Sequence, residues 1–66
     1  MRYRICEVEL GFKKTLEVID FKSKEEILSW MAERGYAGEE DPDFPGFFDL
    51  YTTRDKFLRV FSLEPF

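Results

Sequence analysis

Two stretches near the N-terminus alternate between apolar and polar residues with a period of two positions. They are residues 2–10 (RYRICEVEL) and residues 14–21 (KTLEVIDF). This period is typical of β-strands, whose successive side chains point to opposite faces of a sheet. Gly11 lies between the two stretches, and glycine readily adopts the backbone angles of a tight turn. The pattern therefore predicts a β-hairpin.

The alternation changes phase inside the first of these stretches. Tyr3 and Ile5 are out of phase with Cys6 and Val8. A β-bulge near Ile5 would produce such a change, and so would a strand with both faces partly covered. The sequence leaves both explanations open.

The segment from residue 23 to residue 35 (SKEEILSWMAERG) has the period of an amphipathic helix. Ser23 followed three residues later by Glu26 forms a capping box, in which each side chain accepts a hydrogen bond from a backbone N–H at the helix start. Gly35 is the expected C-terminal stop. We therefore predict one helix of about three turns. Its apolar side is formed by Ile27, Leu28, Trp30 and Met31.

Residues 47–53 (FFDLYTT) and 56–63 (KFLRVFSL) alternate again and predict a second hairpin, with a turn through residues 53–55. The element order is then ββαββ. Because the connections are short, antiparallel pairing is expected. The predicted fold class is α+β: a single domain over residues 1–66, with a small four-stranded, mainly antiparallel sheet and one amphipathic helix packed on one face.

One helix covers only one face of a sheet, so the other face is expected to be open. The apolar side of the helix is largely aliphatic, and we expect it to pack on the aliphatic phase of the strands. That phase consists of Cys6, Val8, Leu10, Leu16, Val18, Phe48, Leu50, Leu58 and Val60. The open face would then carry Tyr3, Ile5, Ile19, Phe21, Phe47, Tyr51, Phe57 and Phe61.

An open aromatic face predicts a contact surface, because large exposed apolar patches on small proteins usually mark interaction sites. Homodimerisation through this face or through a strand edge is one outcome, and binding of another partner is a second. The third is that the flanking loops, with Phe44 and the C-terminal Phe66, fold over the face and bury it.

Composition limits the sources of stability. The chain has 66 residues, of which 44% are hydrophobic and 18% aromatic, so it can fold around one small core. Cys6 is the single cysteine, and the sequence contains no histidine. An internal disulfide and the usual Cys/His zinc patterns are therefore excluded. Self-association or a partner remains as an additional source of stability for so small a domain.

The N-terminal residues 1–12 (MRYRICEVELGF) include Glu7 and Glu9, so they lack the uninterrupted apolar run of a signal peptide. No stretch reaches the roughly 20 apolar residues of a membrane span. We therefore expect a cytoplasmic protein without a membrane partner, which agrees with a lone reduced thiol.

The formal net charge of −4 at pH 7 comes from one segment. Residues 1–32 carry six bases and six acids, and residues 50–66 carry three bases and two acids. Residues 33–49 carry six acids and one base, a sum of −5. Inside this segment, residues 38–43 (GEEDPD) are predicted to form an acidic loop that leads into the second hairpin.

Catalytic chemistry has little support in these residues. Nucleophilic mechanisms need an activated serine or cysteine beside a base, and the usual base, histidine, is missing. Cys6 is expected to be an inert core thiol. Asp41, Asp43 and Gly46 match the start of an EF-hand calcium loop, but Pro45 occupies the position of a ligand. We therefore predict no enzyme activity, no catalytic residues, no cofactor and no specific metal site.

The acidic loop and its aromatic neighbours support a binding function. Clustered carboxylates attract the basic surface of a partner and can imitate nucleic-acid phosphates, while buried rings supply affinity. We therefore predict a small, acidic, non-enzymatic binding protein that engages and inhibits a protein partner, in the manner of a phage-type nucleic-acid mimic. The predicted contact residues are Glu39, Glu40, Asp41, Asp43, Phe44, Phe47, Tyr51 and Phe61.

Two alternative functions use the aromatic face instead. One is a structural homo-oligomer whose subunits meet there. The other is a single-stranded nucleic-acid binder whose bases stack on the exposed rings. Direct nucleic-acid binding is the weaker of the two, because it requires positive potential and the net charge of this chain is negative.

Overall fold

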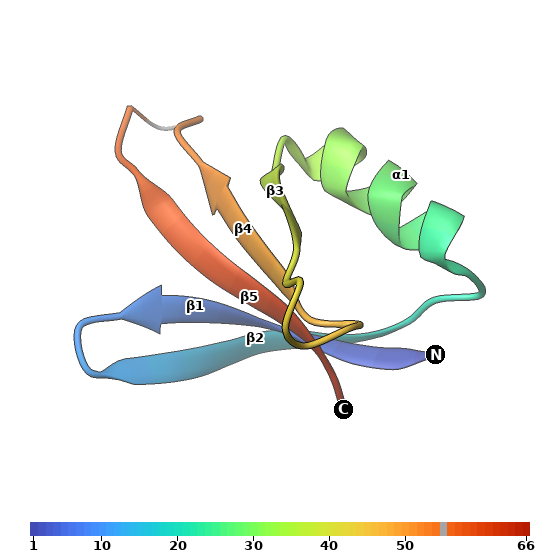
Figure 1. Ribbon diagram of the computed structural model, residues 1–66. Coiled ribbons are helices and arrows are strands. Elements are labelled where there is room, and N and C mark those ends of the chain that lie inside the picture. Colours follow the sequence, from blue (N-terminus) through green and yellow to red (C-terminus); the bar gives the residue numbers. More distant parts are fainter. Residues whose placement is uncertain (55) are drawn as a thin grey trace.

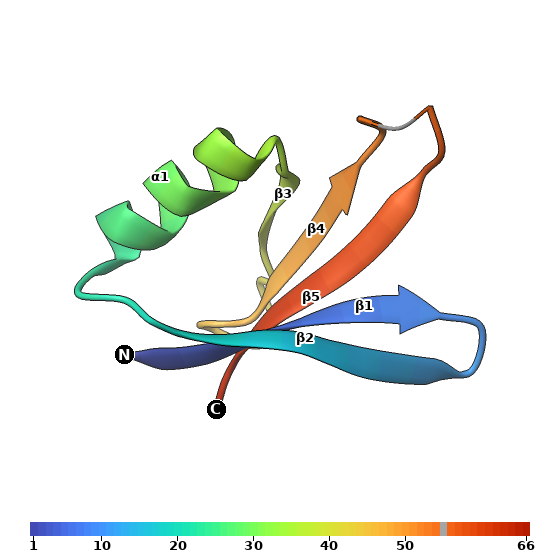
Figure 2. The same cartoon turned by 180° about the vertical axis from the view of Figure 1, so that it is seen from behind.

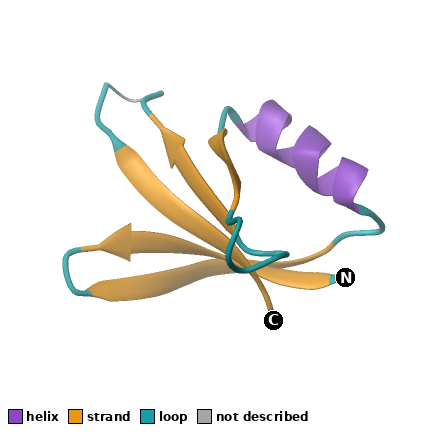
Figure 3. Cartoon of the chain, viewed as in Figure 1, coloured by secondary structure: helices purple, strands orange, loops and turns teal. Residues whose placement is uncertain are grey.

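The structure is a computed structural model that describes residues 1–54 and 56–66. One helix lies beside a five-stranded antiparallel sheet, which makes the fold α+β (Figures 1 and 3). The elements are β1 (Arg2–Glu9), β2 (Phe12–Asp20), α1 (Lys24–Arg34), β3 (Ala37–Glu40), β4 (Phe48–Thr52) and β5 (Arg59–Pro65).

The predicted elements are all present, but the prediction of four strands is wrong by one. The element order is ββαβββ, and the additional strand is β3, which lies inside the predicted acidic loop. Its four residues, Ala-Gly-Glu-Glu, show no apolar alternation, and they form a strand because they pair with β4. Of the predicted turn at residues 53–55, residue 55 lies outside the described residues.

The ends of α1 follow the capping residues that the sequence contains. The Ser23 hydroxyl accepts a hydrogen bond from the Glu26 backbone N–H over 3.2 Å. Gly35 has a φ of 76° and donates its N–H to the Ala32 carbonyl over 3.2 Å, so the left-handed cap closes the last turn. The predicted helix is confirmed. Within the described residues, no helix is long and apolar enough to cross a membrane.

The sheet has the strand order β2-β1-β5-β4-β3, and every neighbouring pair is antiparallel. Helix α1 connects β2 at one edge to β3 at the opposite edge, so the connection has to cross the sheet. Figures 1 and 2 show the helix on one side of the sheet, close to β3. The chain ends lie together, since the Phe66 N–H donates to the Arg2 carbonyl over 2.9 Å.

The helix packs on the phase of the strands that we expected to be open. The prediction is right for β4, whose Phe48 and Leu50 face the core, and wrong for β1, β2 and β5. Ile19 of β2 also packs partly against the core. The core cluster is Tyr3, Ile5, Phe21, Ile27, Met31, Phe48, Leu50, Phe61 and Leu63.

A chain of aromatic contacts explains why this phase is inside. Ring centroids are 5.8 Å apart for Tyr3 and Phe21, 5.7 Å for Phe21 and Trp30, 5.5 Å for Trp30 and Tyr36, and 5.0 Å for Tyr36 and Phe61. Aromatic rings bury more area than aliphatic side chains and gain further from edge-to-face contacts. With only one helix as cover, the sheet therefore turns its rings toward it.

The predicted irregularity of β1 is present as a bulge. The register between β1 and β2 shifts between Ile5 and Cys6, which leaves Leu16 of β2 without a partner. Ile5 faces the core, whereas Cys6 is buried outside the core cluster, with its Sγ 3.7 Å from Thr15 Oγ1. Both explanations that the sequence left open therefore apply to this strand.

One helix position departs from the prediction. Ile27 and Met31 are buried and Trp30 packs partly against the core, but the side chain of Leu28 is 49% exposed. The sheet contacts a narrower side of α1 than the hydrophobic pattern implied, because positions four residues apart lie directly above one another.

Candidate functional site

The sheet face turned away from α1 leaves apolar side chains in solvent. These belong to the aliphatic phase that we expected to be buried, and their exposed fractions range from 37% to 100%. Exposed apolar area of this kind marks a contact surface on a small protein. The exposed members of that phase are Val8, Leu10, Leu16, Val18, Leu58 and Val60, and the strand register places Val8, Val18 and Val60 on this face.

Two carboxylates stand opposite each other on this same face. Glu39 of β3 is the register partner of Asp49 of β4, and both are exposed. Asp49 points away from the helix because its neighbours Phe48 and Leu50 point into the core. Among the described residues, the structure records no ion pair or hydrogen bond for either side chain. Like charges placed directly across two strands are destabilising, so this pair is a cost to the fold.

The loop between β3 and β4 presents two phenylalanines that line a hollow together with Asp49. The Phe47 N–H donates to the Phe44 carbonyl over 3.1 Å, which closes a turn. Pro45 and Gly46, with a φ of 90°, occupy its central positions, as a type II turn requires. The two rings meet edge to face at 6.2 Å and remain 61% and 40% exposed.

Two of the acidic residues have a structural role in this loop. Glu40 accepts a hydrogen bond from Lys24 Nζ over 2.6 Å and from the Gly46 N–H over 2.7 Å. These two donors, Lys24 first, lower the pKa of Glu40. Asp41 Oδ1 accepts from the Asp43 N–H over 2.9 Å. Glu40 and Asp41 therefore hold the loop in place, and Glu39, Asp43 and Asp49 are left to face solvent.

The rings and the sheet enclose a shallow hollow of about 320 Å³. Phe44 and Phe47 line it together with the carboxylates of Asp41, Asp49 and Glu64 and the side chain of Lys13, which is paired with Glu64. The arrangement combines negative charge with exposed aromatic faces, which is the chemistry that binds a guanidinium or ammonium group.

One of the carboxylates that line this hollow, Glu64, is already paired. Its Oε1 lies 2.7 Å from Arg4 Nη2 and its Oε2 lies 3.0 Å from Lys13 Nζ. Ser62 Oγ donates to Oε2 over 3.3 Å. Burial raises the pKa of Glu64, but the hydrogen bonds from Lys13 and Arg4 outweigh it and hold the pKa below its ordinary value. Glu64 is thus an ionised, structurally satisfied group.

The structure brings together most of the predicted contact residues, with one correction. Tyr51 is 48% exposed and shares the face of Asp49. Phe61, expected on an open face, is only 2% exposed because it packs beneath the helix. Of the aromatic face on which the homo-oligomer and nucleic-acid alternatives depend, the rings of Tyr3, Phe21 and Phe61 are buried in the core, whereas those of Phe47, Tyr51 and Phe57 stay exposed.

Sequence reasoning missed the role of Asp49. Asp49 is one of the six acids of residues 33–49, but its position opposite Glu39 depends on β3, which no sequence pattern indicates. The only sequence signal for this opposed position is the spacing of Glu39 and Asp49 across a short hairpin.

Across residues 1–54 and 56–66, no group of three or more Cys, Asp or Glu side chains is placed to hold a metal ion. The chain matches no protein-family model, no curated protein and no solved structure. Functional inference therefore rests on the geometry of this surface.

Proposed function

We propose that this protein is a non-enzymatic binding protein that engages a basic segment of a protein partner. The contact surface is the acidic-aromatic surface, which we define as Glu39, Asp43, Phe44, Phe47 and Asp49. The observation that carries the proposal is the opposed, unpaired Glu39 and Asp49, of which Asp49 lines a hollow together with two exposed rings. Because the pair is a cost to the free protein, a cation that binds between the two carboxylates removes that cost.

The chemistry of the surface favours arginine or lysine as the group that is bound. A guanidinium pairs with a carboxylate through two parallel hydrogen bonds, and it also stacks on an aromatic ring. Phe44, Phe47 and Asp49 line the same hollow, so one cation can reach both kinds of contact. Asp43 on the exposed loop adds long-range attraction, which mainly raises the association rate.

The proposal extends to inhibition. Proteins that bind nucleic acid carry basic clefts, and an acidic surface that occupies such a cleft blocks it. We place this action in the cytoplasm, because the single cysteine, Cys6, is free and buried, which suits a reducing compartment.

A peptide titration tests the proposal. The probe is a short peptide of alternating arginine and alanine, and its matched control carries neutral citrulline at each arginine position. We expect the arginine peptide to shift the amide NMR signals of Glu39, Phe44, Phe47 and Asp49, and the citrulline peptide to leave them unchanged. Shifts that are spread evenly over the surface would contradict a defined site.

Variants of equal charge separate the site from net charge. Glu39→Gln with Asp49→Asn removes two charges at the site, and Glu33→Gln with Asp20→Asn removes two exposed charges elsewhere. Exposed charge pairs contribute up to about 1 kcal/mol each, so the loss of two should weaken binding by up to about thirtyfold. The control variant should change affinity little. Equal losses in both variants would show that only the total charge matters.

A further inference from the structure

The hollow beside Phe44 and Phe47 already contains a cation that belongs to the protein itself. The side chain of Lys13 lines this hollow together with both rings, Asp49 and Glu64. Its Nζ donates a hydrogen bond to Glu64 Oε2 over 3.0 Å. In the free protein, Lys13 therefore supplies the kind of group that the proposed function assigns to the partner, a cation among carboxylates and aromatic rings.

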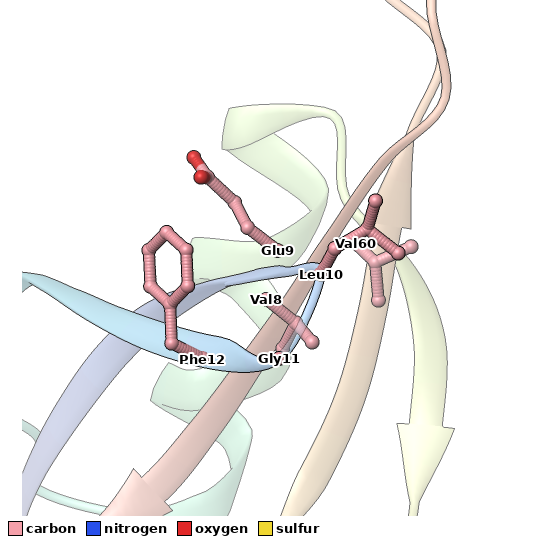
Figure 4. A pocket seen from close by; sticks show the side chains of 6 residues that line it. All are labelled: Val8, Glu9, Leu10, Gly11, Phe12 and Val60. Atoms are coloured by element: carbon pink, nitrogen blue, oxygen red, sulfur yellow. The ribbon is translucent and has the colours of Figure 1, made fainter.

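Lys13 reaches the hollow from the outer strand of the sheet. It lies in β2 as the register partner of Val8 in β1, which is in turn the partner of Val60 in β5. Glu9 and Phe12, the next pair toward the turn, point to the same side of the hairpin (Figure 4). Side chains alternate along a strand, so Lys13 points to the opposite side, which is the sheet face turned away from α1. On that face its side chain extends across β1 to meet its carboxylate partner in β5.

Lys13 is held less firmly than the other base that contacts the same carboxylate. Arg4 binds Glu64 Oε1 through two nitrogens, Nε at 2.9 Å and Nη2 at 2.7 Å, and its guanidinium also lies over the Phe66 ring at 5.7 Å. Among the described residues, the structure records a single partner for Lys13, whose side chain is 51% exposed. A long lysine side chain regains rotamer freedom when it leaves such a contact, which offsets part of the lost ion pair. Lys13 is therefore the base that can leave.

Lys13 also opposes a second cation by repulsion. The hollow is lined by the carboxylates of Asp41, Asp49 and Glu64, and Lys13 brings a positive charge among them. Like charges that share a small volume repel each other over several ångströms. An arginine that enters the hollow therefore gains most when the Lys13 ammonium moves out into solvent.

We propose that Lys13 is an internal competitor of the partner's cation, and that an arginine of the partner binds by displacing Lys13 from Glu64. This inference rests on the proposed function and names the residue that limits its affinity. A guanidinium presents two parallel N–H donors where the ammonium makes one contact, and it also stacks on an aromatic ring. Arg4 and Ser62 stay bound to Glu64 during the exchange, so the buried carboxylate is never left unpaired.

Affinity for the alternating arginine–alanine peptide, measured by isothermal titration calorimetry, tests the proposal. Lys13→Met keeps an apolar stem and removes the ammonium, so it should tighten binding by about fivefold, the value of one exposed ion pair. The matched control is Lys14→Met, which removes the same charge one residue along. Lys14 is the register partner of Glu7 and points to the side of Phe12, away from the hollow, so this change should leave the affinity nearly unaltered. Circular dichroism and thermal unfolding will verify that both variants fold.

The wild-type protein gives a second readout that needs no variant with altered stability. The ammonium NMR signal of Lys13, identified by its absence in Lys13→Met, reports the contact with Glu64. When the arginine peptide saturates the protein, we expect this signal to move to the position of a free lysine. The citrulline peptide should leave it in place.

The outcomes separate the displacement from the proposed function. Equal affinity of the wild type and Lys13→Met would overturn the displacement while the proposed function stands. An equal gain of affinity in Lys14→Met, or a Lys13 signal that stays in place at saturation, would overturn it in the same way. Absence of peptide binding in all three proteins would overturn the proposed function, and the displacement with it.

Discussion

Gly38→Ala should detach β3 from the sheet while the core stays folded. Gly38 has a φ of 145°, a conformation that side chains rarely adopt. A Cβ at this position would overlap the Asp49 carbonyl oxygen and would lie 2.9 Å from both the Asp49 carbonyl carbon and Leu50 Cα. These are backbone atoms of β4, so no side-chain rotation relieves the contact.

The size of the effect follows from two costs. A backbone conformation reserved for glycine costs about 1–3 kcal/mol when another residue adopts it. The overlap with β4 adds to this backbone cost. The total loss of stability cannot exceed the free energy of releasing β3 from β4, because the release removes both the backbone cost and the overlap. We expect a loss of about 2–4 kcal/mol, a large share of the roughly 3–10 kcal/mol expected for a domain of 66 residues.

Urea unfolding measures the predicted loss of stability, and amide hydrogen exchange measures the predicted detachment of β3. Gly11→Ala is the control, because Gly11 also has a positive φ, 82°, but no atom lies within 4 Å of the position of its Cβ. It should cost about 1–2 kcal/mol from the backbone alone. In Gly38→Ala the amides of β3 and β4 should lose protection before those of β1 and β5. Equal losses of stability in the two variants would refute the role assigned to the close approach of β3 and β4.

Two further predictions concern the core and the buried carboxylate. Ile27→Ala should cost about 2–5 kcal/mol by urea unfolding, since the side chain is 1% exposed, whereas Leu28→Ala at 49% exposure should cost less than about 1 kcal/mol. The pKa of Glu64 is lowered in the folded protein, so its stabilisation is complete above the unfolded pKa of about 4.3 and is lost as the pH falls through the folded pKa. The Glu64→Gln variant should therefore be less stable than the wild type at pH 7. Thermal unfolding at a series of pH values should show that this difference in stability shrinks below about pH 4.3. A difference that stays constant with pH would contradict an ionised Glu64.

The elements that the sequence predicted are those whose signals are local. Ser23 and Gly35 determine the ends of α1 through hydrogen bonds to residues within four positions. The change of phase at Ile5 marks a bulge because alternation is a property of one strand. Such signals need no knowledge of the rest of the fold, so they can be read directly from the chain.

The choice of the buried face depends on the whole sheet, and the sequence did not reveal it. Matching an aliphatic helix side to aliphatic strand positions compares residue types. The fold instead maximises buried area, and the contacts from Tyr3 through Trp30 to Phe61 bury more than Val8, Val18 and Val60 could. One helix covers one face, so burying the rings leaves Val8, Val18 and Val60 exposed on the other face.

The acids of residues 33–49 have different roles, which the summed charge of the segment does not show. The roles become visible only once β3 is paired with β4. Glu40 is committed to Lys24 and the Gly46 amide, so removing it would disturb the loop as well as the charge. Glu39 and Asp49 belong to the same segment and share its charge, yet they stabilise nothing within the described chain. Substitution of this pair should therefore weaken the proposed binding, and its effect on stability should be neutral or favourable because it ends the repulsion between the two strands.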